Sequence, residues 1–370
     1  MMSPKDNNTG KHQRQRGFTL AEAAIALAVG TVVVGVAMMA FKNASDAGQF
    51  SVTRSNSQQS ARAALNVVLR DLGQAAISFP QAGVPLPSGT GTSTLFGCSG
   101  CVAGSNTYPN NVMAPVNPGD NKASNGTTDT ITVVYNDPTW PPTAQPVTPA
   151  SDGSSITVST ANFADPNGVL RKYNDTTYGS AVGDIMLVYN SNGYAVGYVT
   201  AIGAGGVLSL SPGTSDPLQI NQTTAPAGNI SWLQNLDALG NKTNVYPNPT
   251  SAKRIKAVTY FIQNAPGPDG ISGTADDIPV LMRQVNGQAA VPVADYVQNF
   301  QITYDTFNDS TSTLQTQLNG GSVTDSTLIR KITITLQIRS PQPIKGNNFD
   351  VVQVTGSVSP RDLSFKDRYN

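Results

Sequence analysis

Few residue types in this 370-residue chain could do acid–base chemistry at neutral pH. Asp and Glu together number 23, but a single one of them is a glutamate, Glu22, which lies inside a long apolar run. The only histidine is His12, upstream of the same run. Because histidine is the side chain best suited to transfer protons near pH 7, one histidine close to the start of the chain is poor material for catalysis. We therefore expect no enzymatic activity.

Two cysteines, Cys98 and Cys101, enclose a Ser-Gly pair within a stretch rich in Gly, Ser, Pro and Asn. A redox motif with this spacing needs a helix that starts directly after a strand, and neither element is indicated nearby. A zinc knuckle needs two further Cys or His ligands, and the rest of the chain offers only His12. In a chain that leaves the cytoplasm, the pattern favours a short local disulfide.

Three aspartates, Asp269, Asp276 and Asp277, cluster in a Gly- and Pro-rich segment between two predicted strands. Carboxylates together with loop carbonyls suit Ca²⁺. The spacing does not match the EF-hand, however, and Pro, Gly and Asp are also the ordinary residues of a hairpin turn. Both interpretations, a calcium site and a plain turn, stay open, and no other cofactor is indicated.

The charge balance excludes a general nucleic-acid binder, because Lys plus Arg also number 23 and the sequence pI is near 6.6. Charged residues make up 12% of the chain, about half the share that is usual in soluble domains. Lys253, Arg254 and Lys256 form a basic trio, which we interpret as a solvated strand edge. The low-charge, Thr- and Asn-rich composition is typical of an exported β-protein.

The segment from Phe18 to Phe41 holds 24 residues with one charge, long enough as a helix to cross a bilayer core of roughly 30 Å. A basic leader precedes it, which places the leader in the cytoplasm and the rest of the chain outside. The run is too long for a secretory signal peptide. A plain transmembrane anchor leaves Glu22 unexplained, because a carboxylate in the membrane is costly.

The sequence Arg16-Gly17-Phe18-Thr19-Leu20-Ala21-Glu22, followed by about twenty apolar residues, resembles the N-terminal signal of type IV prepilins. The resemblance implies that prepilin peptidase cuts between Gly17 and Phe18 and N-methylates Phe18. It also implies that Glu22 is retained for assembly. Cutting would remove four basic residues, one Asp and His12, so that the mature chain would carry a net charge of −3.

After cleavage, the new α-amine of Phe18 and the carboxylate of Glu22 would both lie near or in the membrane. Each needs a partner there, because an isolated charge is costly in an apolar medium. Between neighbouring subunits the amine of one chain can meet the carboxylate of the next, and such a pair would set the register of assembly.

A second helical pattern continues the first, and Pro80 ends it. We expect an amphipathic helix over residues 42–77 after the membrane half at 18–41 and the leader at 1–17, and then a β-rich domain at 78–370. One side of this helix carries an apolar stripe, which consists of Ala61, Ala64, Leu65, Val68, Leu72, Ala75 and Ala76. The polar residues that lie outside the stripe are Arg62, Asn66, Arg70 and Asp71.

Alternating apolar residues predict an antiparallel sheet packed on this helix, an α+β fold. Asn192-Gly193 predicts a two-residue hairpin, and residues 79–128 read mostly as loop. The predicted strands cover residues 129–135, 155–159, 184–189, 194–201, 206–210, 254–263, 278–285, 296–303, 329–339 and 351–358.

Several of these strands, such as Leu281-Met-Arg-Gln-Val and Ile332-Thr-Ile-Thr-Leu-Gln-Ile-Arg339, also resemble PilW-type minor pilins and PulJ-type minor pseudopilins of type II secretion. Two departures blur the subfamily: residues 31–41 lack a proline, and the last strand ends in Ser359-Pro-Arg-Asp. The competing class is a membrane-anchored exported hydrolase or binding domain.

The resemblance implies a minor pilin that helps to initiate or assemble a pilus. Its partners would be prepilin peptidase, other major and minor pilins, the inner-membrane assembly platform and a tip adhesin. The protein would lie in the inner membrane as a single-pass protein with its C-terminal domain outside the cytoplasm, and later near the tip of a pilus or pseudopilus. Retention of Glu22 would place it below the extreme tip.

Overall fold

The computed structural model describes residues 19–87, 112–121, 123, 126–137, 139–140, 145–165, 167–175, 177–221, 228–343 and 348–364. The chain forms two compact units, one up to Ser55 and one from Asn56 onward. Each unit is described by itself. The first unit, in its described part, is the N-terminal portion of one long helix, and the second holds the end of that helix and all strands described below.

Helix α1 runs without interruption from Leu20 to Gly73, which at 1.5 Å per residue is about 81 Å. Regular helix ends four residues before the predicted end at residue 77. The reason lies in the backbone: the Ala76 amide donates to the carbonyl of Val134 in a strand, and Ala76 has a φ of 70°. The chain thus leaves the helix by joining the sheet.

The predicted α+β fold is confirmed, and the β-rich unit is antiparallel in every strand pair. Its strands are β1 (Val84–Pro85), β2 (Val112–Met113), β3 (Val116–Gly119), β4 (Thr130–Asn136), β5 (Gln145–Pro149), β6 (Ser155–Val158), β7 (Phe163–Ala164), β8 (Leu170–Arg171), β9 (Ile185–Asn190), β10 (Gly193–Tyr198), β11 (Ala201–Ile202), β12 (Val207–Ser209), β13 (Ser251–Ala265), β14 (Ile278–Val285), β15 (Val291–Asp295), β16 (Val297–Asn308), β17 (Thr313–Leu318), β18 (Ile329–Arg339) and β19 (Val351–Val358). Short helical turns are η2 (Ala204–Gly206), η3 (Ile230–Leu233), η4 (Gly320–Ser322), η5 (Ser326–Leu328) and α2 (Arg361–Ser364).

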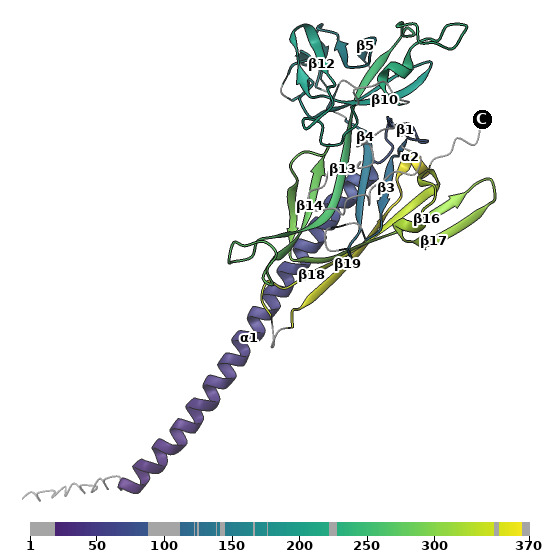
Figure 1. The fold of residues 1–370 in the computed structure, drawn as a ribbon. Helices are drawn as coiled ribbons and strands as arrows, with labels where there is room; N and C mark the ends of the chain where they lie inside the picture. Colours follow the sequence, from purple (N-terminus) through teal and green to yellow (C-terminus); the bar gives the residue numbers. More distant parts are fainter. Residues whose placement is uncertain are drawn as a thin grey trace, which may run out of the picture. The chain divides into compact units, whose positions relative to one another are not determined.

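The 15-residue strand β13 organises what we call the central sheet (Figure 1). Its first residues pair with β9 and β5, its middle with β4, and its last eight with β14. Strands β6, β12 and β11 extend the sheet from β5, whereas β3 and β15 lie beyond β4 and β14. One strand therefore joins the part that carries β5, β10 and β12 to the part that packs on α1.

A second sheet, the C-terminal sheet, has the strand order β17-β16-β18-β19. Its register is regular between β18 and β19, whereas bulges interrupt the pairing of β16 with both neighbours. The inward residues of β18 are a row of isoleucines and a leucine, because side chains alternate between the two faces of a strand. The Thr and Gln residues between them are only partly buried.

The end of α1 packs in a core that both sheets share, and the predicted stripe is confirmed in every position. Ala61, Ala64, Leu65, Val68, Leu72, Ala75 and Ala76 are all buried in this core, which we call the helix core. They are joined by residues such as Tyr260 from β13 and Phe300 from β16. The expectation that Asp71 lies off the buried side is wrong: its exposure is 2%.

Strands correspond to all ten predicted ranges; the bounds of β14, β18 and β19 are as predicted, and the other strands have shifted ends. The predicted hairpin is present between β9 and β10, but its two turn residues are Ser191 and Asn192, and Gly193 opens β10 with a φ of 136°. Residues 79–128 hold more strand than expected, since β3 lies there and pairs with β4. Strand β5 was not predicted, and it carries Pro146 and Pro149, a residue type that is unfavourable inside a sheet.

Candidate processing and assembly site

The predicted cleavage residues Gly17 and Phe18 lie outside the described residues, and Thr19 is the first residue of the site that the structure places. The described part of the site is the first turn of α1, which holds Glu22, and the apolar half of the helix that follows it.

Thr19 and Glu22 form a reciprocal capping box at the start of α1. The Glu22 amide donates to Thr19 Oγ1 at 3.2 Å, and the Thr19 amide and hydroxyl both donate to Glu22 Oε2 at 3.0 Å. The first backbone amides of a helix have no partner within the helix, so this pair satisfies two of them and also places a negative charge at the positive end of the helix dipole. Glu22 thus has a local role that the sequence analysis missed, although a Thr three residues before a Glu is its signal.

The same geometry leaves part of the Glu22 carboxylate available. Both bonds from Thr19 end on Oε2, and Oε1 accepts no hydrogen bond from the residues that the structure describes. The side chains of this turn are exposed in the isolated chain. A cation from another chain can therefore reach Oε1 while the cap stays intact.

The first half of α1 presents apolar side chains on all sides. Leu20, Val33 and Phe41 are 90%, 60% and 78% exposed, and none of the intervening large apolar residues is buried. Thr31 donates its hydroxyl to the carbonyl of Ala28 at 2.8 Å, so this polar group is satisfied within the helix. Such a surface needs a lipid or protein environment, and the helix is long and apolar enough to cross a membrane.

At the other end of α1, three polar side chains form what we call the Asp71 cluster. Asp71 Oδ2 accepts a hydrogen bond from the Tyr260 hydroxyl at 2.6 Å and from Arg283 Nε at 2.7 Å. Arg283 Nε also lies 3.2 Å from the Tyr260 hydroxyl. Since Tyr260 belongs to β13 and Arg283 to β14, the cluster ties the helix to two adjacent strands.

The surroundings of this cluster shift the pKa values of its members. Burial and the neighbouring Asp71 carboxylate raise the pKa of Tyr260 well above its usual value. The same two causes raise the pKa of Tyr135, on β4, to about 12. Burial alone would lower the pKa of Arg283, but Asp71 reverses that effect and raises it. Tyr260 and the neighbouring Tyr135 thus stay neutral, and Arg283 stays charged, at every physiological pH.

The interpretation of Lys253, Arg254 and Lys256 as a solvated edge is wrong for its middle member. Arg254 is buried, with Nε 2.8 Å from Asp137 Oδ2 and Nη2 2.7 Å from Thr139 Oγ1. Lys256 Nζ lies 3.0 Å from Asp137 Oδ1. These cations therefore neutralise buried carboxylates within the central sheet, and Arg254 is not available to a polyanion.

The loop between β13 and β14 holds Asp269, Asp276 and Asp277, as predicted, but their oxygens are directed at the loop itself. Asp269 Oδ1 accepts from the Ile271 amide at 2.8 Å, and Asp277 Oδ2 from the Gly273 amide at 2.8 Å. Among the described residues, no group of three acidic, His or Cys side chains is placed to hold a metal ion. The geometry is that of a turn, and calcium binding stays a prediction.

The predicted disulfide cannot be placed, because Cys98 and Cys101 lie outside the described residues.

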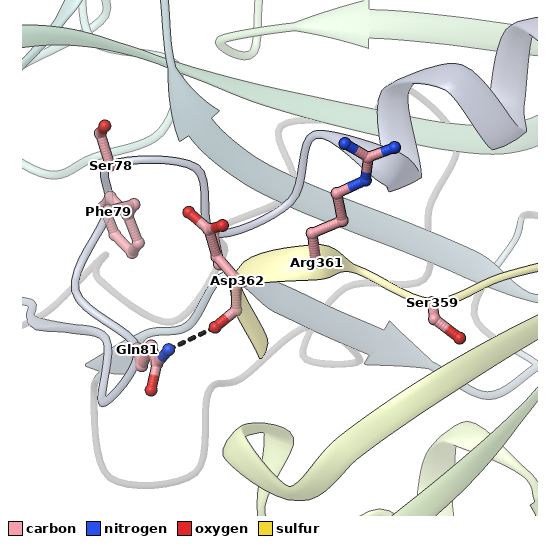
Figure 2. Close-up of a pocket in the computed structure, with 7 residues that line it drawn as sticks. Ser78, Phe79, Gln81, Ser359, Arg361 and Asp362 are labelled. Carbon is pink, nitrogen blue, oxygen red and sulfur yellow. Dashed lines mark hydrogen bonds between the residues drawn. The ribbon is translucent and has the colours of Figure 1, made fainter. Parts of the chain in front are cut away.

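The cavities that described residues line include two of several hundred cubic ångströms. One, of about 610 Å³, lies beside the turn after α1 and next to α2 (Figure 2). Its polar side chains include Gln81, which donates to the backbone carbonyl of Asp362, and Arg361. It brings together one carboxylate and one guanidinium, not the paired carboxylates of a glycosidase.

The second cavity, of about 790 Å³, lies between β5, β6 and the segment that leads into β13. The described residues that line it are prolines, valines and hydroxyl or amide side chains, with no acidic or basic group among them. It therefore offers hydrogen-bonding surface but no proton donor or acceptor for acid–base chemistry at neutral pH.

One comparison with known proteins gives a match, and the matched residues include the first turn of α1. The family model of the prokaryotic N-terminal methylation motif matches residues 12–38. No curated protein matches the chain, and no solved structure does either. The motif implies processing by prepilin peptidase and contact with other pilins in general, and the single apolar helix fits an inner-membrane anchor. The methylation motif and the apolar helix that follows it support a type IV pilin-like or pseudopilin-like protein.

Proposed function

We propose that the chain is a minor pilin, a structural subunit that helps to initiate and assemble a type IV pilus. The observation that carries this proposal is the continuity of α1. The methylation motif leads directly into a helix whose first half is apolar and exposed and whose last 18 residues belong to the β-rich unit. A helix of this kind links an assembly segment to a large domain, and it performs no reaction of its own.

The charges at the start of the helix suit this role. Cleavage after Gly17 would put a positive α-amine one residue before Thr19, and the free oxygen of Glu22 faces no described partner. In an apolar bundle of helices, the amine of an adjacent subunit is the cation that this oxygen can accept. Such a pair would fix the axial offset between the two helices, which is the best-attested use of a buried ion pair.

The size of the domain supports a minor subunit. Removal of residues 1–17 leaves 353 residues, most of them in the β-rich unit, and that bulk would hinder dense repetition along a shaft. The resemblance of the sheet to PulJ-type proteins supports a second candidate, a minor pseudopilin of type II secretion. In both cases the chain would be held in the inner membrane with its β-rich unit outside the cytoplasm, and would later lie near the filament tip. A tip adhesin and the assembly platform are the further partners.

The intact mass of the protein isolated from its own cells tests the proposal. We expect the loss of residues 1–17 and a gain equal to one methyl group in place of hydrogen, located on Phe18. An unprocessed N-terminus would overturn the proposal and would favour the membrane-anchored hydrolase or binding domain.

A substitution tests the charge pair. Glu22→Ala should be inserted and processed but should enter filaments poorly, because the neighbouring amine is left without a partner. Asp46→Ala is the matched control, since Asp46 is also an exposed acidic residue of α1 but follows the apolar run. Normal incorporation of Glu22→Ala would remove the pairing argument.

A further inference from the structure

We propose that the outer edge of β19 is a docking site for an extended strand of a neighbouring, different pilin-like subunit. The inference rests on the proposed function for the identity of the partner. Strand β19 is the last strand of the C-terminal sheet and pairs only with β18. Its eight residues, Val351–Val358, contain no charged residue and no proline.

The ladder geometry shows which backbone groups point outward. The Ser340 amide donates to the carbonyl of Asp350 at 2.7 Å, so the backbone of residue 350 faces β18. Backbone direction alternates along an antiparallel strand, and the register of β19 has no bulge. The amides and carbonyls of residues 351, 353, 355 and 357 therefore point away from β18. None of them bonds to another described segment.

The other edge strands of the central sheet and of the C-terminal sheet are protected. The edge strands β3 and β15 contain Pro118 and Pro292, and β11 has two residues. At the edge of β10, the Asn221 side chain accepts a hydrogen bond from the Tyr198 amide and donates one to the Tyr198 carbonyl. Strand β17 is irregular, with a bulge in its pairing and a φ of 56° at Gln317. Proteins use such devices against edge pairing, and β19 has none of them.

The outer face of β19 is also held in place. Gln337 Nε2 donates to Gln353 Oε1 at 3.0 Å, and the hydroxyls of Thr335 and Thr355 lie 3.3 Å apart. These cross-strand pairs stabilise the regular pairing of β19 with β18. An incoming strand would meet an ordered row of donors and acceptors, so little conformational entropy would be lost on the β19 side.

The position of β19 beside α1 identifies the occupant. A Cβ on Gly356 would lie 2.8 Å from a methyl group of Leu69 and 3.0 Å from one of Leu65, so the strand lies directly against the helix. Leu65 and Leu69 belong to α1, the helix whose apolar first half would pack on an adjacent subunit under the proposed function, so the edge lies on the element that carries the proposed contact. The outward amides and carbonyls of β19 can be paired by the backbone of another extended segment. Since β19 carries no charged residue, that segment needs no complementary charge. A minor subunit has a neighbour of different sequence, which makes that neighbour the partner.

The test uses the full-length chain in its own cells under conditions in which filaments assemble. A photoreactive benzophenone amino acid replaces Gln353 on β19 or, as the matched control, Gln315 on β17. We expect the probe at 353 to cross-link to an extended segment of another chain that carries the N-terminal methylation motif, and the probe at 315 not to do so. The N-terminus of the same sample is analysed by mass spectrometry.

Three substitutions at Thr355 then probe the backbone. Thr355→Pro removes one outward amide while leaving the bonds to β18, and Thr355→Lys places a charge on the edge without changing any backbone bond. Each should lower the cross-link yield about tenfold. Thr355→Val keeps the amide and should not lower it. The thermal midpoint of each variant verifies folding, and Thr355→Lys serves if Thr355→Pro does not fold.

The inference is overturned if a processed chain gives no cross-link from residue 353, or if both Thr355→Pro and Thr355→Lys cross-link as well as the unsubstituted chain. A cross-link to a second copy of this chain, or to a lipid or polysaccharide, also overturns it. An unprocessed N-terminus is a different result, because it refutes the proposed function, so that the two failures are distinguishable.

Discussion

The Asp71 cluster allows a quantitative prediction about how α1 is held by the β-rich unit. We consider Arg283→Met, which removes the cation but keeps the aliphatic length of the side chain. Asp71 would then be a buried carboxylate with the Tyr260 hydroxyl as its hydrogen-bond donor and the largely exposed Arg70, whose Nε lies 3.9 Å from Oδ1, as its nearest cation. Loss of one member of a fully buried ion pair costs about 3–5 kcal/mol. Arg283 keeps 23% of its side chain exposed, so water screens part of that cost, and we expect about 2–3 kcal/mol.

The assay is thermal unfolding of the full-length protein in detergent, followed by circular dichroism and by the fluorescence of the buried Trp140. A loss of this size should lower the midpoint by roughly 3–5 °C in a unit of about 300 residues. Lys331→Met is the control, because its partner Asp305 lies 3.3 Å away in a pair whose lysine is 46% exposed. That change should cost less than about 1 kcal/mol.

A double substitution separates the two causes. Asp71→Leu combined with Arg283→Met removes the uncompensated charge, so the double variant should be more stable than Arg283→Met alone. If Arg283→Met destabilises no more than Lys331→Met, or if the two cluster substitutions are additive, the cluster does not fasten the helix and our reasoning is refuted.

Three further predictions concern the cap, a buried carboxyl and the loop. Thr19→Val should weaken the helix start by about 1 kcal/mol and speed amide hydrogen exchange in the first turn, whereas Thr31→Val should not. Burial raises the pKa of Asp216 to about 6, so its contribution to stability is full below about pH 4 and is lost as the pH rises through 6. Asp216→Asn should flatten that dependence, which amounts to about 3 kcal/mol, in unfolding measured against pH. Because the carboxylates of Asp269 and Asp277 accept from amides of their own loop, calcium should leave the melting midpoint unchanged; a rise that Asp276→Asn abolishes would establish a calcium site instead.

Local patterns were sufficient for the main elements. The spacing of small and apolar residues from Ala61 to Ala76 identified the buried side of α1, because a helix repeats every 3.6 residues regardless of what it packs on. Alternation identified the strands in the same way. Strand β5 was not predicted. Pro146 and Pro149 have no backbone N–H to donate to a continuous ladder, but the strand pairs with β6 on one side and with β13 only at its start.

The polar contacts were not predictable from local patterns. Asp71 read as a solvent-facing residue because its partners lie 189 and 212 residues away in the sequence. Arg254 was misread for the same reason, since its buried partners come from distant loops. The cap at Thr19 differs, because its signal is local: Thr19 stands three residues before Glu22, a residue that the sequence analysis assigned to the charge pair with Phe18 only.

The helix core also dictates when the protein can finish folding. The apolar stripe of α1 is covered in part by β18 and β19, and β19 ends at Val358, nearly 300 residues after the helix ends. At roughly 5–20 residues per second, the ribosome needs about 15–60 s to make that stretch. During this interval the stripe can gain the cover that β4, β13 and β14 supply, but the cover from β18 and β19 is still missing. The helix core is therefore complete only after the last strand has been made.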